Sequence, residues 1–312
     1  MRPHAAGLKA LLSEPALQIM PGCGDGLGAR LIAEAGFKVA FASGSSISAT
    51  RLAMPDMDLL AFPEMRDAVE TIIAAAPDVL WLADGDTGYG NAISVQKTIR
   101  AYARAGAAAV LIEDKIWPRP LGQKGAKLVI ERDAARLRCR AAVEACREEG
   151  ILLLARTDAR TSCGFDEALA RIGDFVAEGA DIFFLDSPQT EAEMRASVEA
   201  CHGKPAIAVT SSAGKHFMPA NAELARIGIR VVVYPQEILA ATVHAVRSAL
   251  AGLKGGERAR MATVSELAGA IRMADYLALD ERLSRPVWAR DRHPALAPGA
   301  RGWIDPAPTR RG

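Results

Sequence analysis

The 312-residue sequence predicts an α/β fold of the (β/α)8 TIM-barrel type, on three observations. Eight short, uniformly apolar runs are bounded by turn residues, which is typical of buried parallel strands. Amphipathic stretches of helical period separate these runs, and polar residues gather at the carboxyl end of the runs. Eight strand–helix alternations in roughly 250 residues match this barrel in number and size. An open doubly wound sheet shows the same alternation, so the pattern alone does not establish closure.

The predicted strands are the apolar runs themselves. Their carboxyl ends carry polar groups such as "SGSS", "DGDTGYGN", "EDK", "RTD" and "DSP", and in parallel α/β folds ligands bind at that rim. We therefore expect the chemistry on one face of the fold. The runs lie at 17–22, 38–44, 78–85, 108–115, 151–158, 181–188, 205–210 and 230–235.

The predicted helices follow the strands in turn, and most of them end at a glycine that suits a left-handed C-cap. These glycines are Gly36, Gly106, Gly150, Gly179, Gly203 and Gly228. The amphipathic stretches lie at 27–36, 63–76, 93–106, 131–150, 165–179, 191–203, 221–228 and 238–253.

The chain is expected to divide into a barrel domain, residues 1–251, and a C-terminal extension, residues 252–312. Within the extension, residues 263–283 have a helical pattern, and such a helix can pack on a neighbouring subunit. Residues 286–312 are rich in Pro, Arg and Gly, which predicts an irregular or mobile tail.

The composition indicates a small-molecule partner in the cytoplasm. The 38 Lys and Arg against 37 Asp and Glu leave a net charge of +1, which does not favour nucleic acid or an anionic membrane. No apolar stretch reaches the roughly 18 to 20 residues of a spanning helix. The five cysteines are far apart and form no C-x-x-C pair, so we expect neither disulfides nor a zinc site.

A group of carboxylates is predicted at the rim. Asp84 and Asp86 close the third strand, Glu113 and Asp114 close the fourth, and Asp56 lies in the loop after the second. Converging carboxylates repel one another unless a cation lies among them, and oxygen-only ligands suit Mg²⁺ or Mn²⁺. Alternatively, Asp84 and Asp86 cap a turn or helix.

Two further stretches are suited to an anionic substrate. The segment 43–49, "SGSSISA", offers hydroxyls and backbone N–H groups, while Gly88 and Gly90 allow the backbone to approach a ligand closely. Arg156, at the end of the fifth strand, presents a planar fork for a carboxylate. Its alternative role is a structural ion pair with an acid of the rim.

Five motifs in order, "SGSSISA", "DGDTGYGN", "EDK", "ARTDA" and "ELARIGIRVVVYP", resemble the isocitrate lyase / phosphoenolpyruvate mutase superfamily over most of residues 10–250. The resemblance implies a Mg²⁺-dependent barrel, commonly a tetramer, otherwise a dimer, in which a C-terminal helix swaps between subunits. It also implies the roles of individual residues. These are Asp84, Asp86 and Glu113 as metal ligands, Asp56, Arg156 and Lys124 as catalytic residues, and Ser43, Gly44, Ser45, Arg156 and Tyr234 as contacts of a substrate carboxylate.

The loop at 117–127, "WPRPLGQKGAK", departs from the lyases of this superfamily, which carry a Cys-Gly-His there with the thiol as proton donor. Leu121, Gly122 and Gln123 stand in those places, and a positioned acid contributes about 10² to 10⁴-fold to a rate. Loops of this form resemble those of the oxaloacetate decarboxylase branch. The resemblance therefore implies decarboxylation of oxaloacetate to pyruvate and CO₂.

Several alternatives stay open. They are a C–C lyase of the methylisocitrate or 2,3-dimethylmalate type, an enzyme like phosphoenolpyruvate mutase or phosphonopyruvate hydrolase, and a non-catalytic scaffold barrel. Gly24, Gly26 and Ala29 formally match a dinucleotide fingerprint, but the expected ribose-binding acid is missing. Cys163 or His216 could replace the absent acid, although structural roles are favoured for both, and Lys115 is expected to be solvated.

Overall fold

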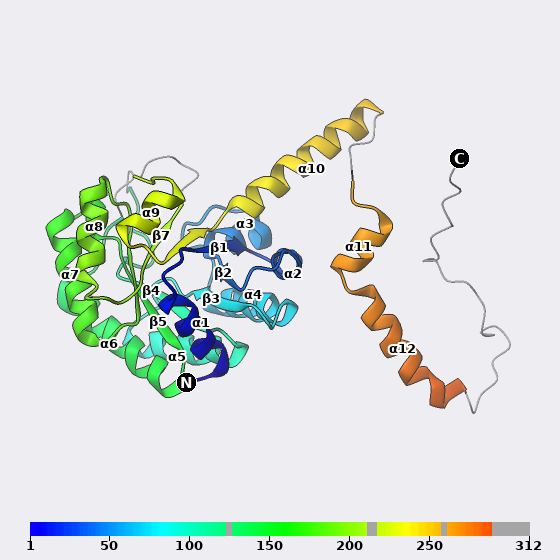
Figure 1. The fold of residues 1–312 in the computed structure, drawn as a ribbon, viewed down its shortest axis with the longest axis horizontal. Coiled ribbons are helices and arrows are strands. Elements are labelled where there is room, and N and C mark those ends of the chain that lie inside the picture. The colour runs from blue at the N-terminus through cyan, green and yellow to red at the C-terminus, as the bar shows by residue number, and fades with distance from the viewer. Residues whose placement is uncertain (123–126, 211–216, 257–260, 289–312) are drawn as a thin grey trace. The chain divides into compact units, whose positions relative to one another are not determined.

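The computed structural model describes residues 1–122, 127–210, 217–256 and 261–288, and the predicted strands form a closed parallel barrel (Figure 1). Neighbours in the barrel follow chain order, and β8 pairs with β1 to close the ring. This confirms the (β/α)8 fold and excludes the open sheet. The strands are β1 Gln18–Cys23, β2 Val39–Ala42, β3 Leu80–Asp84, β4 Ala109–Glu113, β5 Leu152–Thr157, β6 Ile182–Leu185, β7 Ala206–Val209 and β8 Val231–Tyr234.

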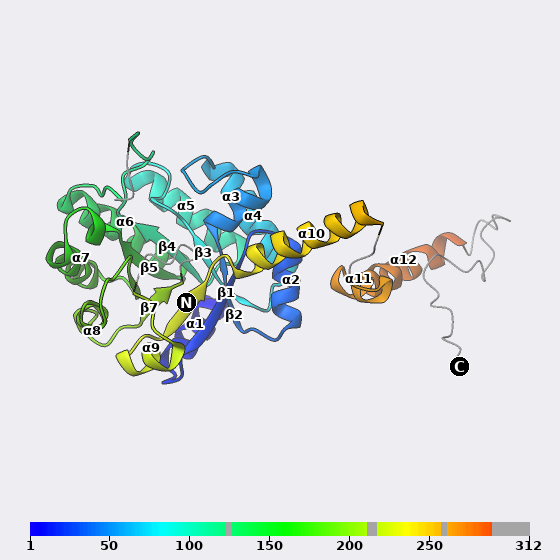
Figure 2. The same cartoon turned by 90° about the horizontal axis from the view of Figure 1, so that it is seen from above.

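Helices connect the strands and cover the outside of the barrel (Figures 1 and 2). Six predicted capping glycines all have positive φ, between 70° and 106°, as a left-handed cap requires. Two helices, α1 and α3, were not expected from the sequence. The helices of this part of the chain are α1 Pro3–Ser13, α2 Gly26–Glu34, α3 Gly44–Leu52, α4 Phe62–Ala75, α5 Ala92–Ala105, α6 Arg132–Glu149, α7 Phe165–Glu178, α8 Glu191–Ala200, α9 Asn221–Ile227 and α10 Glu237–Gly255.

The strands are buried on both faces, which explains why they are almost uniformly apolar. The core includes Trp81, Leu153, Leu154 and Phe183, whose side chains are 0–1% exposed. The indole N–H of Trp81 donates to the carbonyl oxygen of Ala76 at 2.9 Å, so the one polar group of this side chain is satisfied.

The strand register brings the functional candidates to one rim. Glu113 of β4 lies opposite Arg156 of β5, and Asp84 of β3 lies opposite Leu111 of β4. In a parallel barrel all carboxyl ends meet at the same rim. Acidic and basic side chains that are far apart in the sequence therefore become neighbours.

The chain divides into two compact units, residues 1–245 and 246–312. Beyond α10, the described residues of the second unit form two helices, α11 Val264–Ala270 and α12 Met273–Trp288, where the sequence suggested one continuous helix over 263–283. Arg272, at a φ of 55°, interrupts the helical path between them. The helix α12 continues through Pro286, where an irregular chain was expected. Residues 289–312 lie outside the described part of the chain.

Two expectations drawn from composition can be compared with the structure. All five cysteines are free in this chain. Of the helices within the described ranges, none is both long enough and apolar enough to cross a bilayer.

Candidate active site

Four carboxylates interact electrostatically at the rim: Asp56, Asp84, Asp86 and Glu113. Burial, then the charges of Glu113 and Asp56, raise the pKa of Asp84 to about 6. Burial, followed by the charges of Asp84, Glu113 and Asp56, raises the pKa of Asp86 well above its usual value. The structure thus brings together the acids that the sequence pattern suggested, apart from Asp114.

Backbone groups hold the two aspartates that follow β3. The N–H of Gly44 donates to Asp84 Oδ2 at 3.1 Å, and the N–H of Asp86 donates to Asp84 Oδ1 at 3.3 Å. The hydroxyl of Tyr89 donates to Asp86 Oδ2 at 2.5 Å. Among described residues, no Lys or Arg nitrogen lies within 4.0 Å of either carboxylate. Their negative charge therefore has no adjacent protein cation.

Glu113, in contrast, lies between two cations. Its Oε1 is 2.9 Å from Lys115 Nζ, and its Oε2 is 3.3 Å from Arg156 Nη1. Lys115 Nζ also lies 3.4 Å from Asp58 Oδ1. The expectation that Lys115 is solvated was wrong, because this ammonium is buried between two acids.

Asp114 does not share the site, and its predicted convergence with the other acids was wrong. Neighbouring side chains of an extended strand point to opposite sides. Asp114 therefore points away from Glu113. It accepts hydrogen bonds from Thr157 Oγ1 at 2.7 Å and from the N–H of Asp158 at 2.9 Å, and it pairs with Arg171 Nη1 at 3.1 Å.

The acid cluster fits a hard divalent cation that is held partly through water. Its donors are all oxygens, as Mg²⁺ and Mn²⁺ prefer. Within the described residues, no three Asp, Glu, His or Cys side chains form a ready ligand cage. Mg²⁺ usually takes only one or two carboxylates and keeps several waters. Asp84 and Asp86, half-buried and without an adjacent protein cation, are suited to be that pair.

Arg156 connects the acid cluster to a second group of charges. Its Nε and Nη2 donate to the two oxygens of Asp158 at 2.9 and 2.7 Å, and Nη2 also donates to Asp186 Oδ1 at 3.2 Å. With the ion pair to Glu113, Arg156 makes the structural contacts that its alternative role predicts. It also lines the cavity described below, where an anion can reach it.

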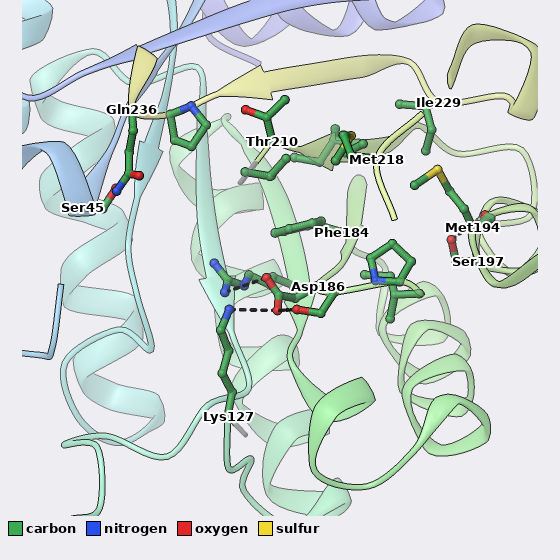
Figure 3. Close-up of a pocket in the computed structure, with 18 of the residues that line it drawn as sticks. Ser45, Lys127, Phe184, Asp186, Met194, Ser197, Thr210, Met218, Ile229 and Gln236 are labelled. Carbon is green, nitrogen blue, oxygen red and sulfur yellow. Dashed lines mark hydrogen bonds and ion pairs between the residues drawn. The ribbon is translucent and has the colours of Figure 1, made fainter. Parts of the chain in front are cut away.

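Lys127 completes this second group from the loop after β4. Its Nζ lies 2.9 Å from Asp158 Oδ1. It also lies 2.9 Å from Asp186 Oδ2 (Figure 3). Burial raises the pKa of Asp158, but Arg156 and Lys127 together hold it well below its usual value. The predicted catalytic residue of this loop, Lys124, lies outside the described residues, as do Gln123 and His216.

The predicted carboxylate-binding segment forms the start of α3. Ser43 is the N-cap of this helix, and its hydroxyl lies 3.1 Å from that of Ser45. A helix N-terminus favours a negative charge. A Cβ on Gly44 would lie 2.8 Å from Asp84 Oδ2, so only glycine fits between this helix and the acid cluster.

A cavity of about 210 Å³ opens beside Arg156. Its polar lining residues include Ser45, Asp56, Lys127 and Asp186. Apolar side chains such as Met194, Met218 and Ile229 line another part of it (Figure 3). The apolar wall is formed chiefly by Phe184, Met194, Ile207, Val209, Met218 and Ile229. The cavity can therefore hold a small molecule with a charged end and an apolar end.

Tyr234 is placed elsewhere. Its hydroxyl donates to Asn221 Oδ1 at 2.9 Å, at the start of α9. The following residues, Pro235 and Gln236, line the cavity instead. Cys163 is exposed and contacts the hydroxyl of Ser162, and it is not among the residues described as lining the cavity.

The sequence reasoning missed Asp58, Lys127 and Asp158. Asp158 had a usable signal, because it stands two residues after Arg156 and residues so spaced point to the same side of a strand. Asp58 and Lys127 lie in loops, where no periodicity indicates the direction of a side chain. Both receive their role from contacts between distant segments, such as the hydrogen bond from the N–H of Arg119 to Asp58 Oδ2 at 2.6 Å.

Comparison with known proteins identifies relatives of this chain. Residues 8–254 match the family model described as phosphoenolpyruvate phosphomutase. The chain is 36% identical over 231 residues to 2,3-dimethylmalate lyase of Eubacterium barkeri, covering 74% of this chain and 79% of that protein. It is 39% identical over 176 residues to oxaloacetate decarboxylase of Paraburkholderia xenovorans (strain LB400), covering 56% of this chain and 58% of that protein.

Solved structures show the same architecture. Oxaloacetate acetylhydrolase in complex with the inhibitor 3,3-difluorooxalacetate aligns with a TM-score of 0.84 at 31% identity, over 90% of this chain and 97% of the other. A phosphonopyruvate hydrolase complex with oxalate and Mg²⁺ aligns with a TM-score of 0.76 at 26% identity, over 94% of this chain and 100% of the other.

Proposed function

The chain belongs to the phosphoenolpyruvate phosphomutase family, within the isocitrate lyase / phosphoenolpyruvate mutase superfamily, and on that premise we propose that it is a Mg²⁺-dependent lyase. It forms an enolate from a small 2-oxo or 2-hydroxy dicarboxylate. The preferred reaction is decarboxylation of oxaloacetate to pyruvate and CO₂. Mn²⁺ is a possible substitute for Mg²⁺, because both prefer oxygen ligands.

The observation that carries the proposal is that, among the described residues, no protein cation lies within ion-pair distance of Asp84 or Asp86. The raised pKa values of both acids indicate that ionised carboxylates at these places need a further positive charge. Asp84 and Asp86 would hold the metal, directly or through water, with Glu113 and Asp56 beside them. When bound, Mg²⁺ would supply Lewis-acid stabilisation of the negative charge that develops on the substrate oxygens.

The chain's own residues bind and orient the substrate. The hydroxyls of Ser43 and Ser45 and the start of α3 favour a carboxylate, and Arg156 supplies a fixed positive charge nearby. Asp158 and Asp186 hold the guanidinium of Arg156 in place by hydrogen bonds, so the cation is oriented before substrate arrives. Phe184, whose ring centre lies 5.2 Å from the guanidinium carbon of Arg156, and the other apolar residues of the cavity limit water beside this cation.

Decarboxylation fits the groups that this cavity offers. The titratable residues described as lining it are Asp56, Lys127, Arg156 and Asp186, with neither a thiol nor an imidazole among them. Leu121, which stands where related lyases carry the acidic cysteine, is fully exposed. Loss of CO₂ leaves an enolate that water can protonate, whereas a C–C lyase lacking its acid would lose about 10² to 10⁴-fold in rate. The relationship to oxaloacetate decarboxylase supports the same choice.

A C–C lyase acting on a 2-alkylmalate or methylisocitrate is the second candidate. The apolar wall of Phe184, Ile207 and Val209 would accept an alkyl substituent, which oxaloacetate does not have. The relationship to 2,3-dimethylmalate lyase over three quarters of the chain also supports it. This reaction would need a proton donor other than Leu121 or Gln123.

Product analysis decides between these candidates. The full chain is incubated with Mg²⁺ and, separately, oxaloacetate, 2-methylisocitrate, 2,3-dimethylmalate or phosphonopyruvate, and products are followed by NMR. We expect pyruvate from oxaloacetate, faster than with Asp84→Ala/Asp86→Ala protein at the same Mg²⁺ concentration. Equal rates for both proteins would contradict the proposed site.

The loop is tested by restoring the lyase residues. Leu121→Cys combined with Gln123→His supplies the missing thiol and imidazole, and we expect cleavage of 2,3-dimethylmalate or 2-methylisocitrate to rise. If neither substrate is cleaved faster, the loop does not separate the two activities. Decarboxylation by this double variant serves as the control that the barrel is intact.

Assembly and location are also proposed. Apolar side chains on the C-terminal helices, including Leu250, Leu253, Leu267 and Tyr276, are exposed within the single chain. Residues 252–312 are therefore proposed to contact another copy in a homo-oligomer, a dimer or tetramer, through an exchanged helix. A cytoplasmic location is proposed because all five cysteines are free.

A further inference from the structure

A second cavity lies where the barrel strands begin, at the end opposite the candidate active site. It has a volume of about 460 Å³, larger than the 210 Å³ beside Arg156. It is lined by the end of α1, including Lys9 and Leu12, and by residues at the starts of β5, β6, β7 and β8. The proposed catalytic reaction has no use for this space.

Strand geometry separates the two cavities. Leu152 begins β5 and lines the second cavity, whereas Arg156 lies four residues later and lines the first. At about 3.3 Å per residue, these two positions are roughly 13 Å apart along the strand. A ligand of one cavity does not occupy the other.

The second cavity is positively charged. Three cationic residues line it, Lys9, Lys204 and Arg230, against one acid, Asp181. Across the described ranges, none of the three cations lies within ion-pair distance of a carboxylate, although most arginines in the barrel do pair with one. Asp181 Oδ2 accepts a hydrogen bond from the N–H of Leu153 at 3.0 Å.

Two of these cations are held in place by neutral groups. Lys204 Nζ donates to the carbonyl oxygen of Ala180 at 2.6 Å and lies 5.7 Å from the ring centre of Phe183. Arg230 Nη1 donates to the carbonyl oxygen of Pro15 at 3.2 Å. Each cation keeps N–H donors for a ligand and is partly oriented before a ligand binds.

We propose that this cavity binds a compact multivalent anion, with phosphate or several carboxylates as the charged groups. Fixed cations without acidic partners attract such a ligand, and Arg230 offers a fork that suits either chemistry. Leu12 and Ile182 also line the cavity and can contact the small carbon skeleton that carries these charged groups. This proposal does not depend on the reaction at the other rim.

Isothermal titration calorimetry of the full chain, freed of metal ions by passage over a chelating resin and kept in a buffer without EDTA, tests the proposal without any measurement of activity. The probes are inorganic pyrophosphate and citrate, and the variant is Lys9→Gln combined with Arg230→Gln. We expect at least one probe to bind, with affinity lowered about tenfold or more in the variant. Lys38→Gln is the matched control for the single Lys9→Gln variant, because each removes one exposed lysine charge and Lys38 lies outside the cavity lining.

Each outcome decides the question. Binding of pyrophosphate alone, or of citrate alone, supports the site and identifies its chemistry. Failure of both probes to bind, equal affinity in the double variant, or equal weakening by Lys38→Gln would overturn it. Circular dichroism checks the fold, and if the double variant does not fold, the single Lys9→Gln variant on the exposed side of α1 replaces it.

Discussion

Replacing Asp84 with asparagine should stabilise the metal-free protein at neutral pH and remove its response to Mg²⁺. Burial, followed by the charges of Glu113 and Asp56, raises the pKa of Asp84 from 3.8 to about 6. One pKa unit corresponds to about 1.4 kcal/mol. Keeping Asp84 ionised in the folded protein at pH 7 therefore costs on the order of 3 kcal/mol.

The sign of the effect fixes its pH dependence. Below the unfolded-state pKa of 3.8, Asp84 is protonated in both states and costs nothing. As pH rises, the unfolded chain releases its proton first, so the free energy of unfolding falls until about pH 6 and then stays constant. Asparagine removes this charge. Asparagine has one side-chain carbonyl oxygen where aspartate offers two, so one of the N–H groups of Gly44 and Asp86 loses its acceptor. This loss reduces the gain in stability by about 1 kcal/mol.

Urea unfolding in EDTA measures the difference. We expect Asp84→Asn to be about 2 kcal/mol more stable than the native sequence at pH 7.5, with the gain absent near pH 4. Mg²⁺ at a hundred times its dissociation constant should stabilise the native sequence by about 2.7 kcal/mol and the variant by much less. Asp78→Asn, at an exposed position, is the charge-matched control. A variant less stable than the native sequence in EDTA at pH 7.5, or equally stabilised by Mg²⁺, would refute the reasoning.

Three further results are expected. Lys127→Met should lower kcat/KM for oxaloacetate about tenfold or more, because Asp158 and Asp186 lose a cation that pairs with both. Steady-state kinetics should show a smaller loss in Lys127→Arg, and equal kcat/KM in the native protein and both variants would exclude a role for Lys127 in the reaction. Asp114→Ala should lower the free energy of unfolding by about 1–3 kcal/mol, because the buried hydroxyl of Thr157 and the N–H of Asp158 lose their acceptor while Arg171 keeps Glu167; a loss under 1 kcal/mol in urea would contradict this. Titration with a disulfide reagent should find one fast thiol, the exposed Cys163, and four slow ones that are buried; a second fast thiol in folded protein would count against the packing.

The barrel itself was predictable from the sequence because each strand is covered on both faces. Burial on two sides makes a strand apolar throughout, and such a run can be recognised in the sequence without knowing which strands pair with it. Closure of the ring was not predictable, since it depends on the pairing of the first strand with the last, as between Gln18 and Val231, which lie far apart in the sequence. The helix α3 was missed because "GSSISATRL" has weak helix formers and little amphipathic pattern.

The candidate site was predictable where strand geometry sets direction. Asp84 and Asp86 are two residues apart and share an electrostatic environment. The same alternation places the side chains of the adjacent residues Glu113 and Asp114 on opposite sides of the strand, so Asp114 could have been excluded from the site by sequence alone. Lys127 could not be found this way, because its partners lie on other strands and its own segment is a loop.

The pairing of β1 with β8 has a consequence for synthesis of the protein. Until the segment around Val231 has been made, β1 has no partner on one side, and the incomplete sheet has two open edges. A nascent chain of some two hundred residues is therefore a template for pairing with other chains, and any fragment that ends before β8 keeps that hazard permanently.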